Sequence, residues 1–143
     1  MTIEIRLLEE GDVAVLDRVA NDVFDHAVIA EQAARFLADP GHYLVVALHA
    51  DTVVGIGSAN EYLHPDKPLQ FWINEMGVAP EYQRRGIGRQ LLDVLLGVAR
   101  DLGCKEVWLG TEVENVPARA LYRSAGGKEE NFVMYTFELG ETR

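Results

Sequence analysis

The chain has 143 residues, of which 48% are hydrophobic, so residues 1–143 suffice for one domain with a substantial core. Its 13 Lys and Arg residues against 23 Asp and Glu residues give a formal net charge of -10 at pH 7. Such an acidic surface repels nucleic-acid phosphates and anionic lipids, so we expect neither nucleic acid nor a membrane as a partner. A cationic partner is favoured.

The N-terminal residues and the residue types that bind metals also limit the interpretation. Residues 1–6 begin a charged, alternating pattern that lacks the basic start and apolar run of a secretory signal, so we expect a cytoplasmic protein. The single Cys104 cannot form an intramolecular disulfide, and we expect it to fill part of the core. The four His residues are scattered without metal-ligand spacing, so no metal is expected.

The first half of the chain predicts a strand, two helices and a hairpin. Residues 2–8 alternate apolar and polar side chains, which is the period of a half-buried strand. Apolar side chains recur at helical spacing over residues 13–24, and a second helix is expected over residues 29–37. The apolar, β-branched runs 43–49 and 52–61 are separated by a two-residue turn and predict neighbouring strands.

The second half predicts three more strands and two helices. Residues 69–79 are typical of a central strand, and a wide apolar stripe predicts a helix that ends at Gly103. A buried strand over residues 106–111 and a short helix over 115–125 follow, and residues 132–139 alternate as a last strand. This order predicts a mixed sheet covered by helices.

The turn between the central strand and the long helix is rich in Arg and Gly. Glycines let a ligand approach the backbone, and the free N–H groups and dipole of the helix start attract an anion. Arg84, Arg85 and Arg89 stand out in an acidic chain and can supply forked donors to phosphate oxygens. A solvated basic face is the alternative, but cations are disfavoured at a helix N-terminus unless an anion is also there. Gly77, just before this turn, indicates a bulge or the close approach of another backbone or a ligand.

Two other glycine motifs fit this turn less well. A dinucleotide-binding fingerprint needs a third glycine at the position that Leu91 occupies. A P-loop needs Gly-Lys followed by Ser or Thr, and the sequence has no such run.

Gln83-Arg84-Arg85-Gly86-Ile87-Gly88 resembles the acyl-CoA pyrophosphate-binding signature of the GNAT superfamily of N-acetyltransferases. The strand end 75–80 and the segment 115–127 are similar to that superfamily in the same order, so the resemblance covers nearly the whole domain. It implies an α/β (α+β) GNAT fold, in which a twisted, mixed and mostly antiparallel sheet of about six to seven strands is flanked by about four helices. Domains of this superfamily often dimerise, and a homodimer is therefore expected.

The resemblance also implies an enzyme that uses acetyl-CoA and no metal. Backbone atoms of Met76 and Val78 would pair with the pantetheine arm, with the Val78 N–H facing the thioester oxygen, and Tyr122 would donate a proton to the thiolate. The alternative for Tyr122 is core packing, and the alternative for Asn115 is a helix cap. The coenzyme-binding residues are expected to be Met76, Gly77, Val78, Gln83, Arg84, Arg85, Gly86, Ile87, Gly88, Arg89 and Asn115.

The acceptor is expected to be a small-molecule amine. Glu75 could remove a proton from the amine, directly or through water, and its charge would attract a cation; the alternative is a plain exposed carboxylate. Several segments, including Ala120-Leu121-Tyr122, resemble the aminoglycoside 3-N-acetyltransferases, although that family has Asp where this chain has Glu75. Asp25, Glu61 and Glu112 are the expected contacts to a polycationic acceptor. Acetylation of a polyamine or a protein amine, or a non-catalytic acyl-CoA-binding module, are the alternatives.

Overall fold

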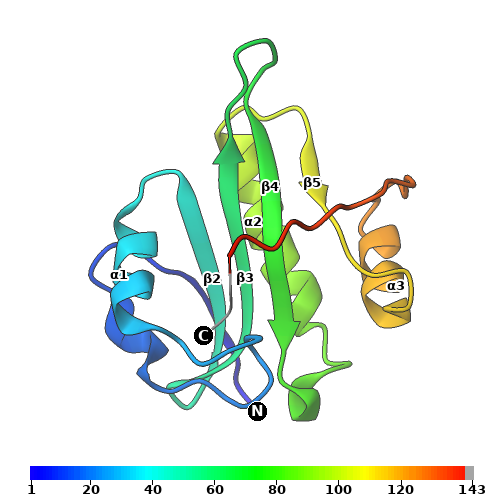
Figure 1. Cartoon of the computed structure of the whole chain (residues 1–143). Helices are drawn as coiled ribbons and strands as arrows, with labels where there is room; N and C mark the ends of the chain where they lie inside the picture. The colour runs from blue at the N-terminus through cyan, green and yellow to red at the C-terminus, as the bar shows by residue number, and fades with distance from the viewer. Residues whose placement is uncertain (141–143) are drawn as a thin grey trace.

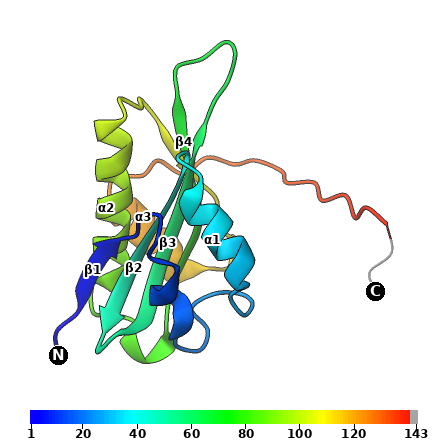
Figure 2. The same ribbon diagram turned by 90° about the vertical axis from the view of Figure 1, so that its left-hand side faces the viewer.

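The computed structural model describes residues 1–140, which form one mixed sheet with helices on both faces (Figure 1, Figure 2). The strands, in their spatial order, are β1 (Glu4–Leu7), β2 (His42–His49), β3 (Thr52–Tyr62), β4 (Gln70–Val78) and β5 (Val107–Leu109). The helices are α1 (Ala30–Ala38), α2 (Ile87–Asp101) and α3 (Val116–Ser124), with short 3-10 helices at Val13–Asp17 and Pro80–Tyr82.

The predicted fold class is confirmed, because neighbouring strands are antiparallel except for the parallel pair β4 and β5. The described residues contain five strands and three α-helices, fewer than the sequence predicts. The predicted hairpin is also correct. Its turn residues Ala50 and Asp51 have φ angles of 47° and 67°, and positive φ at both positions is typical of a type I′ hairpin turn.

Two apolar cores lie on opposite faces of the sheet. Helix α2 covers one face, while α1 and the first 3-10 helix cover the other (Figure 2). Neighbouring residues of one strand therefore enter different cores: Val45 packs on the α2 side and Val46 on the α1 side. Burial on both faces explains why β2 and β3 have continuous apolar runs and not an alternating pattern.

The helix predicted over residues 13–24 is wrong beyond Asp17. The backbone turns there to pair with the start of β3: Ala20 N donates to Val53 O, and Val53 N donates to Arg18 O, each at 2.8 Å. These bonds to another strand replace the i to i−4 bonds that a helix would need. Leu16 and Val23 are nevertheless buried in the α1-side core, so the apolar spacing predicted burial correctly and helical conformation incorrectly.

The strand predicted over residues 132–139 is also not formed. Within the described residues this segment pairs with no strand, and it runs away from the sheet on the side of α1 (Figure 2). The strand predicted over residues 106–111 is shorter, and its central residue Trp108 is 47% exposed, not buried. We attribute the exposure of β5 to the lack of a second neighbouring strand within residues 1–140.

Strand β4 contains both a bulge and a close approach of another backbone, the two features that Gly77 indicated, but they lie at different positions. The register with β3 skips Asn74, because Ser58 pairs with Glu75 and Ala59 with Ile73, so the bulge lies at Asn74. At Gly77 the backbone of the preceding loop comes so close that a Cβ would overlap the carbonyl oxygen of Val23. Gly77 therefore allows the loop that carries Asp25 to lie against β4.

We expect Gly77→Ala to lower the free energy of unfolding by about 3 kcal/mol, because the methyl group must displace the Val23 backbone. Gly97→Ala is the matched control: Gly97 lies inside α2, and a Cβ there meets no atom of the described residues within 4 Å. That substitution should raise the free energy of unfolding by about 0.5 to 1 kcal/mol. Urea unfolding of both variants measures the two changes, and equal effects would contradict the close approach at Gly77.

Candidate active site

The site forms where β4 and β5 separate. The two parallel strands pair only through Phe71–Ile73 and Val107–Leu109, and the last paired residues are Ile73 and Leu109. Beyond them the bulge bends β4, while the chain after Leu109 turns toward α3 (Figure 1). The second half of β4 therefore has β3 on one side and an open edge on the other, within the described residues.

The open edge of β4 presents the backbone groups of Met76 and Val78. Ala79 N donates to Val54 O at 2.8 Å, so Ala79 directs its N–H toward β3. Because successive residues of a strand direct their backbone groups to alternate sides, Met76 and Val78 direct theirs away from β3. The Val78 carbonyl already accepts a bond of 3.0 Å from Gln83 Nε2. The Val78 N–H and the Met76 backbone remain available to an extended ligand.

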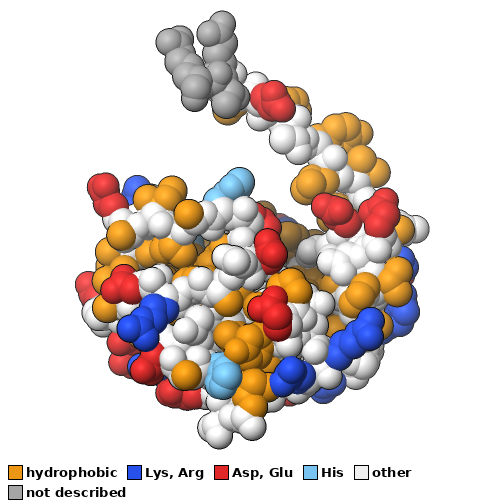
Figure 3. Space-filling view, turned by 90° about the horizontal axis from the view of Figure 1, so that it is seen from below, with side chains coloured by type: hydrophobic (Ala, Val, Ile, Leu, Met, Phe, Trp, Pro, Cys, Tyr) orange, Lys and Arg blue, Asp and Glu red, His pale blue; other side chains and the backbone are white. Residues whose placement is uncertain are grey.

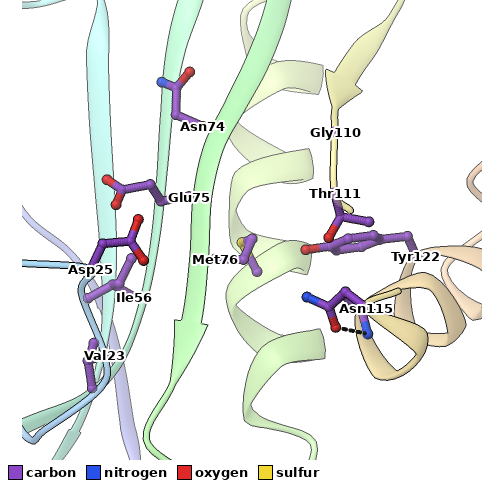
Figure 4. Close-up of a pocket in the computed structure, with 11 residues that line it drawn as sticks. Val23, Asp25, Ile56, Asn74, Glu75, Met76, Gly110, Thr111, Asn115 and Tyr122 are labelled. Atoms are coloured by element: carbon purple, nitrogen blue, oxygen red, sulfur yellow. Dashed lines mark hydrogen bonds between the residues drawn. The ribbon is translucent and has the colours of Figure 1, made fainter. Parts of the chain in front are cut away.

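A pocket of about 200 Å³ lies beside this edge (Figure 4). Its walls come from the loop before α1, the ends of β4 and β5, and the first turn of α3. The lining residues are Val23, Asp25, Ile56, Asn74, Glu75, Met76, Gly110, Thr111, Asn115, Ala118 and Tyr122. This volume suits an acetyl group and an amine, so a whole coenzyme would have to extend along the edge of β4.

Two carboxylates form one wall of the pocket. Glu75 follows the bulge in β4, Asp25 lies on the loop held against Gly77, and both line the pocket (Figure 4). Glu75 Oε1 accepts a long hydrogen bond of 3.5 Å from Ser58 Oγ. Both carboxylates are exposed, and together they make this wall negative, which suits an ammonium group.

Tyr122 lies on the opposite wall, with its hydroxyl directed across the pocket toward Met76 (Figure 4). Its ring is half-buried and packs against the α2-side core. Burial raises the pKa of the Tyr122 hydroxyl above its ordinary value. The hydroxyl therefore keeps its proton at neutral pH, as a proton donor must. Core packing and a site role are both compatible with this position.

Asn115 caps α3 and also lines the pocket. Its Oδ1 accepts from Ala118 N at 3.2 Å, which is the helix-cap alternative, while its amide nitrogen points toward Met76 (Figure 4). Asn74 and Thr111 are polar lining residues that the sequence interpretation missed. Asn74 and Thr111 come just after Ile73 and Leu109, the last paired residues of the two parallel strands. Ligands often bind at the carboxyl ends of parallel strands, so the positions of Asn74 and Thr111 after two predicted strands could have identified them.

Two of the expected acceptor contacts lie outside this pocket. Glu61 lies one residue before the end of β3, and because β3 and β4 are antiparallel it pairs with Phe71 near the start of β4, away from Glu75. Its Oε2 accepts a hydrogen bond of 2.7 Å from the Tyr43 hydroxyl. Glu112 follows Thr111 in the chain and is exposed, and it is not among the described residues that line the pocket. Asp25 alone of the three lines the pocket.

The turn rich in Arg and Gly lies at the start of α2, below the open edge of β4 (Figure 1). Gly86 caps the helix with a φ of 79°, a conformation that favours glycine. Arg84 and Arg85 are exposed, and neither forms an ion pair with a carboxylate of the described residues. Figure 3 views this end of the molecule, where Lys and Arg side chains gather along one side. The arrangement suits an anion.

Three other residues expected at the coenzyme have further contacts. Ile87 is buried in the α2-side core, so only its backbone can face a ligand. Gly88 allows close packing of α3, since a Cβ there would lie 3.2 Å from Leu121 Cδ2. Arg89 pairs with Asp93 at 3.0 Å one turn further along α2, which leaves it less available than Arg84 and Arg85.

Within residues 1–140, no group of three or more His, Cys, Asp or Glu side chains is arranged to hold a metal ion. None of the helices in this part of the chain is long and apolar enough to cross a bilayer.

Solved structures with the same fold include acetyltransferases. An aminoglycoside acetyltransferase from an uncultured soil metagenomic sample, in complex with sisomicin, superposes with a TM-score of 0.81 at 21% identity, covering 96% of this chain and 97% of that chain. AAC(6′)-Iy, in complex with the bisubstrate analog CoA-S-monomethyl-acetylneamine, gives 0.79 at 16% identity, covering 97% and 100%. At these identities the similarity shows the fold.

Two curated relatives are more similar in sequence. N-alpha-acetyltransferase RimI of Mycobacterium tuberculosis is 40% identical over 92 residues, which span 64% of this chain and 56% of that protein. Aminoglycoside N(6′)-acetyltransferase type 1 of Stenotrophomonas maltophilia is 32% identical over 112 residues, covering 73% of this chain and 72% of that protein. The position named in the aminoglycoside relatives is 6′, so the 3-N position implied by the sequence resemblance finds no support.

The family model described as "Acetyltransferase (GNAT) family" matches residues 11–126. This range begins before the first 3-10 helix, ends just after α3, and includes the whole pocket. The chain therefore belongs to the GNAT acetyltransferase family.

Proposed function

We propose that this protein is an acetyl-CoA-dependent N-acetyltransferase that acts on a primary amine of a small polycationic acceptor, an aminoglycoside in particular. One observation carries the proposal: the pocket beside the open edge of β4 has the Glu75 carboxylate on one wall and the Tyr122 hydroxyl on the other. A base and an acid on opposite sides of one small space suit a reaction that takes a proton from one reactant and gives one to another.

The residues present fit the coenzyme. The free backbone groups of Met76 and Val78 can hold an extended pantetheine arm as an added strand, and the start of α2 with Arg84 and Arg85 can hold its pyrophosphate. When bound, acetyl-CoA supplies a thioester whose acetyl group an amine can accept. The Oδ1 atom of Asn115 caps α3, while its amide nitrogen points toward Met76. We propose that this amide nitrogen is a further contact to the coenzyme.

We assign one role each to Glu75, Tyr122 and Asp25 in the pocket and to Val78 at the open edge of β4. Glu75, directly or through water, accepts the proton of the substrate ammonium group and so provides the neutral amine. The Val78 N–H would donate a hydrogen bond to the thioester oxygen and stabilise negative charge there. Tyr122 would donate its proton to the departing sulfur and take up, directly or through water, the second proton that the nitrogen loses on becoming an amide, so that the products are a neutral thiol and an amide and Tyr122 ends protonated. Asp25 adds negative charge beside the amine without entering the proton transfer.

The acceptor assignment has two supports. The wall formed by Asp25 and Glu75 matches the several ammonium groups of an aminoglycoside. The Stenotrophomonas maltophilia relative, which aligns over 73% of this chain, is by its name an aminoglycoside acetyltransferase.

A protein N-terminal amine is the second candidate acceptor. The observation that favours it is the similarity to RimI of Mycobacterium tuberculosis, which is 40% identical but spans only 64% of this chain. A single N-terminal ammonium group would also bind beside Glu75, but it would gain less from a second carboxylate.

Release of coenzyme A thiol from acetyl-CoA tests the proposal. The purified protein is incubated with kanamycin, sisomicin, spermidine and a peptide with an N-terminal Ala, and kcat/KM is measured for each. We expect the highest value for an aminoglycoside, with KM rising as added salt screens the carboxylates over a Debye length of about 10 Å at 0.1 M. A higher value for the peptide would favour the second candidate. Binding of acetyl-CoA without release by any amine would indicate a non-catalytic module.

We expect Arg84→Ala combined with Arg85→Ala to raise the Kd of acetyl-CoA by about 100-fold, or roughly tenfold for each charged hydrogen-bonding group lost. Arg100→Ala, at the opposite end of α2, is the matched control and should leave the Kd unchanged. Titration calorimetry measures all three proteins. Gly88→Val is a poorer test, because the added side chain would also press on Leu121. An unchanged Kd in the double variant would remove the turn from the coenzyme site.

A further inference from the structure

The turn before α2, residues 83–86, contains a strained residue. Arg84 has a φ of 63°, in the left-handed region that residues with a side chain seldom adopt, and Gly86 has a φ of 79°. These two left-handed residues stand on either side of Arg85 and shape the turn that, in the proposed function, holds the pyrophosphate. A strained backbone persists where its surroundings hold it in place, so the neighbours of this turn decide whether it keeps its shape.

Tyr82 lies directly before the turn and anchors it to the rest of the domain. It ends the 3-10 helix Pro80–Tyr82, and its half-buried ring packs against both the α1-side core and the α2-side core. The Arg85 guanidinium lies over the same ring, with its central carbon 5.7 Å from the ring centroid, which is a cation–π contact. The position of the Tyr82 ring therefore influences where the charge of Arg85 lies.

His49, the last residue of β2, holds the Tyr82 hydroxyl. His49 Nδ1 and that hydroxyl share a short hydrogen bond of 2.6 Å, and the two rings meet edge to face with their centroids 5.5 Å apart. The two residues are 33 positions apart in the chain, so the bond ties the end of β2 to the segment that follows β4, at the lower end of the sheet in Figure 1. His49 is not among the described residues that line the pocket.

We propose that His49 is a positioning residue for the coenzyme: through Tyr82 it holds residues 83–86 in the conformation that binds the pyrophosphate. This role rests on the proposed function, because it concerns the same coenzyme site. A turn that is already held in its binding conformation loses less conformational freedom when the ligand binds. Loss of the hydrogen bond between His49 and Tyr82 should therefore weaken coenzyme binding, although neither Nδ1 nor the hydroxyl needs to touch the coenzyme.

Calorimetric titration with acetyl-CoA is the first test. We expect His49→Ala to raise the Kd about fivefold, the net contribution of one hydrogen bond. Tyr82→Phe keeps the ring under Arg85 and removes only the hydroxyl, so it should raise the Kd by the same factor. The double variant should bind as each single variant does, since both changes remove the same bond. Additive effects of the two changes, or an unchanged Kd in either single variant, would overturn the proposal.

His42→Ala is the matched control. His42 starts β2, is half-buried as His49 is, and has comparable contacts: its Nδ1 lies 3.2 Å from Asp39 Oδ1, and its ring centroid lies 4.9 Å from that of Phe36. Its loss should lower the free energy of unfolding, as the loss of His49 does, but leave the Kd of acetyl-CoA unchanged. Urea unfolding and calorimetry measure both quantities. An equal rise of the Kd in His42→Ala would contradict a positioning role for His49.

The conservative variant His49→Asn separates the hydrogen bond from the packing of the ring. The Asn side chain places an amide atom near the position of Nδ1, so the bond to Tyr82 can form again and the Kd should return close to the wild-type value. Equal Kd values for His49→Asn and His49→Ala would show that the imidazole ring acts through packing alone, and would overturn the proposal.

Steady-state kinetics separates this role from the proposed function. In an active protein, His49→Ala should raise the KM of acetyl-CoA and leave kcat unchanged, because the coenzyme, once bound, reaches the same pocket. A lower kcat with an unchanged KM would overturn the positioning role and leave the proposed function intact. Binding of acetyl-CoA that depends on His49, without thiol release by any amine, would support the role and contradict the acetyl transfer. A wild-type protein that binds no acetyl-CoA would overturn both.

Discussion

Replacing Tyr122 with Phe is expected to lower kcat by about 10² to 10⁴-fold, while the Kd of acetyl-CoA stays the same. The substitution keeps the ring that packs against the α2-side core and removes only the hydroxyl that points into the pocket. Stopped-flow and steady-state kinetics, together with calorimetry, separate the two quantities. A variant with wild-type turnover would mean that water or another group protonates the sulfur.

Tyr43→Phe is the matched control for this substitution. Burial and the hydrogen bond to Glu61 raise the pKa of Tyr43 to about 12, but its hydroxyl bonds to Glu61 on the far part of the sheet. We expect Tyr43→Phe to cost about 1 kcal/mol of stability and to leave kcat unchanged. Because the pKa of Tyr122 is also raised, loss of activity through its deprotonation should begin only above the ordinary tyrosine value of about 10.

Glu75→Gln is expected to lower kcat by about 10² to 10⁴-fold through loss of the general base, and to raise the KM of a polycationic acceptor through loss of a charge. Gln keeps the size of the side chain and the contact with Ser58, so the fold should be unaffected. Glu10→Gln, an exposed position before the first 3-10 helix, is the matched control.

The conservative variant Glu75→Asp distinguishes a base from a positioning group. A carboxylate that works through water tolerates a shorter side chain, so Glu75→Asp should retain far more activity than Glu75→Gln. If Glu75→Gln has wild-type kcat, then Asp25, the other carboxylate of the pocket, becomes the candidate base.

The elements that the sequence predicted correctly depend on local chemistry. The hairpin β2–β3 has a turn between two apolar runs, and α3 has an Asn cap and a proline in its first turn. The start of α2 was recognisable because its glycines and arginines are contiguous in the chain. At Gly77 the sequence predicted a bulge or the close approach of another backbone or a ligand. The structure has the close approach of the Val23 backbone at Gly77, and the bulge lies three residues earlier, at Asn74.

The errors arise where distant segments decide the conformation. The segment after Asp17 has helical spacing, but its backbone groups pair with Val53, which lies far along the chain. Glu61 and Glu75 both stand near strand ends, and only the antiparallel register shows that these ends lie apart. The alternation of residues 132–139 predicts a strand, but a strand requires a neighbour, and a single copy within residues 1–140 provides none.

The separation of β4 from β5 also determines how two reactants can meet. The pocket is lined by Ile56, which belongs to the α1-side core, and by Met76, which packs against the α2-side core, so it lies between the two faces of the sheet. In the proposed reaction, the coenzyme would reach this pocket along the open edge of β4, and the acceptor would reach it beside Asp25 and Glu75. Cys104 packs against the α2-side core, and burial raises the pKa of its thiol, which keeps it in the unreactive form. Cys104 also does not line the pocket, so the proposed reaction passes the acetyl group directly to the amine, without an acetylated cysteine.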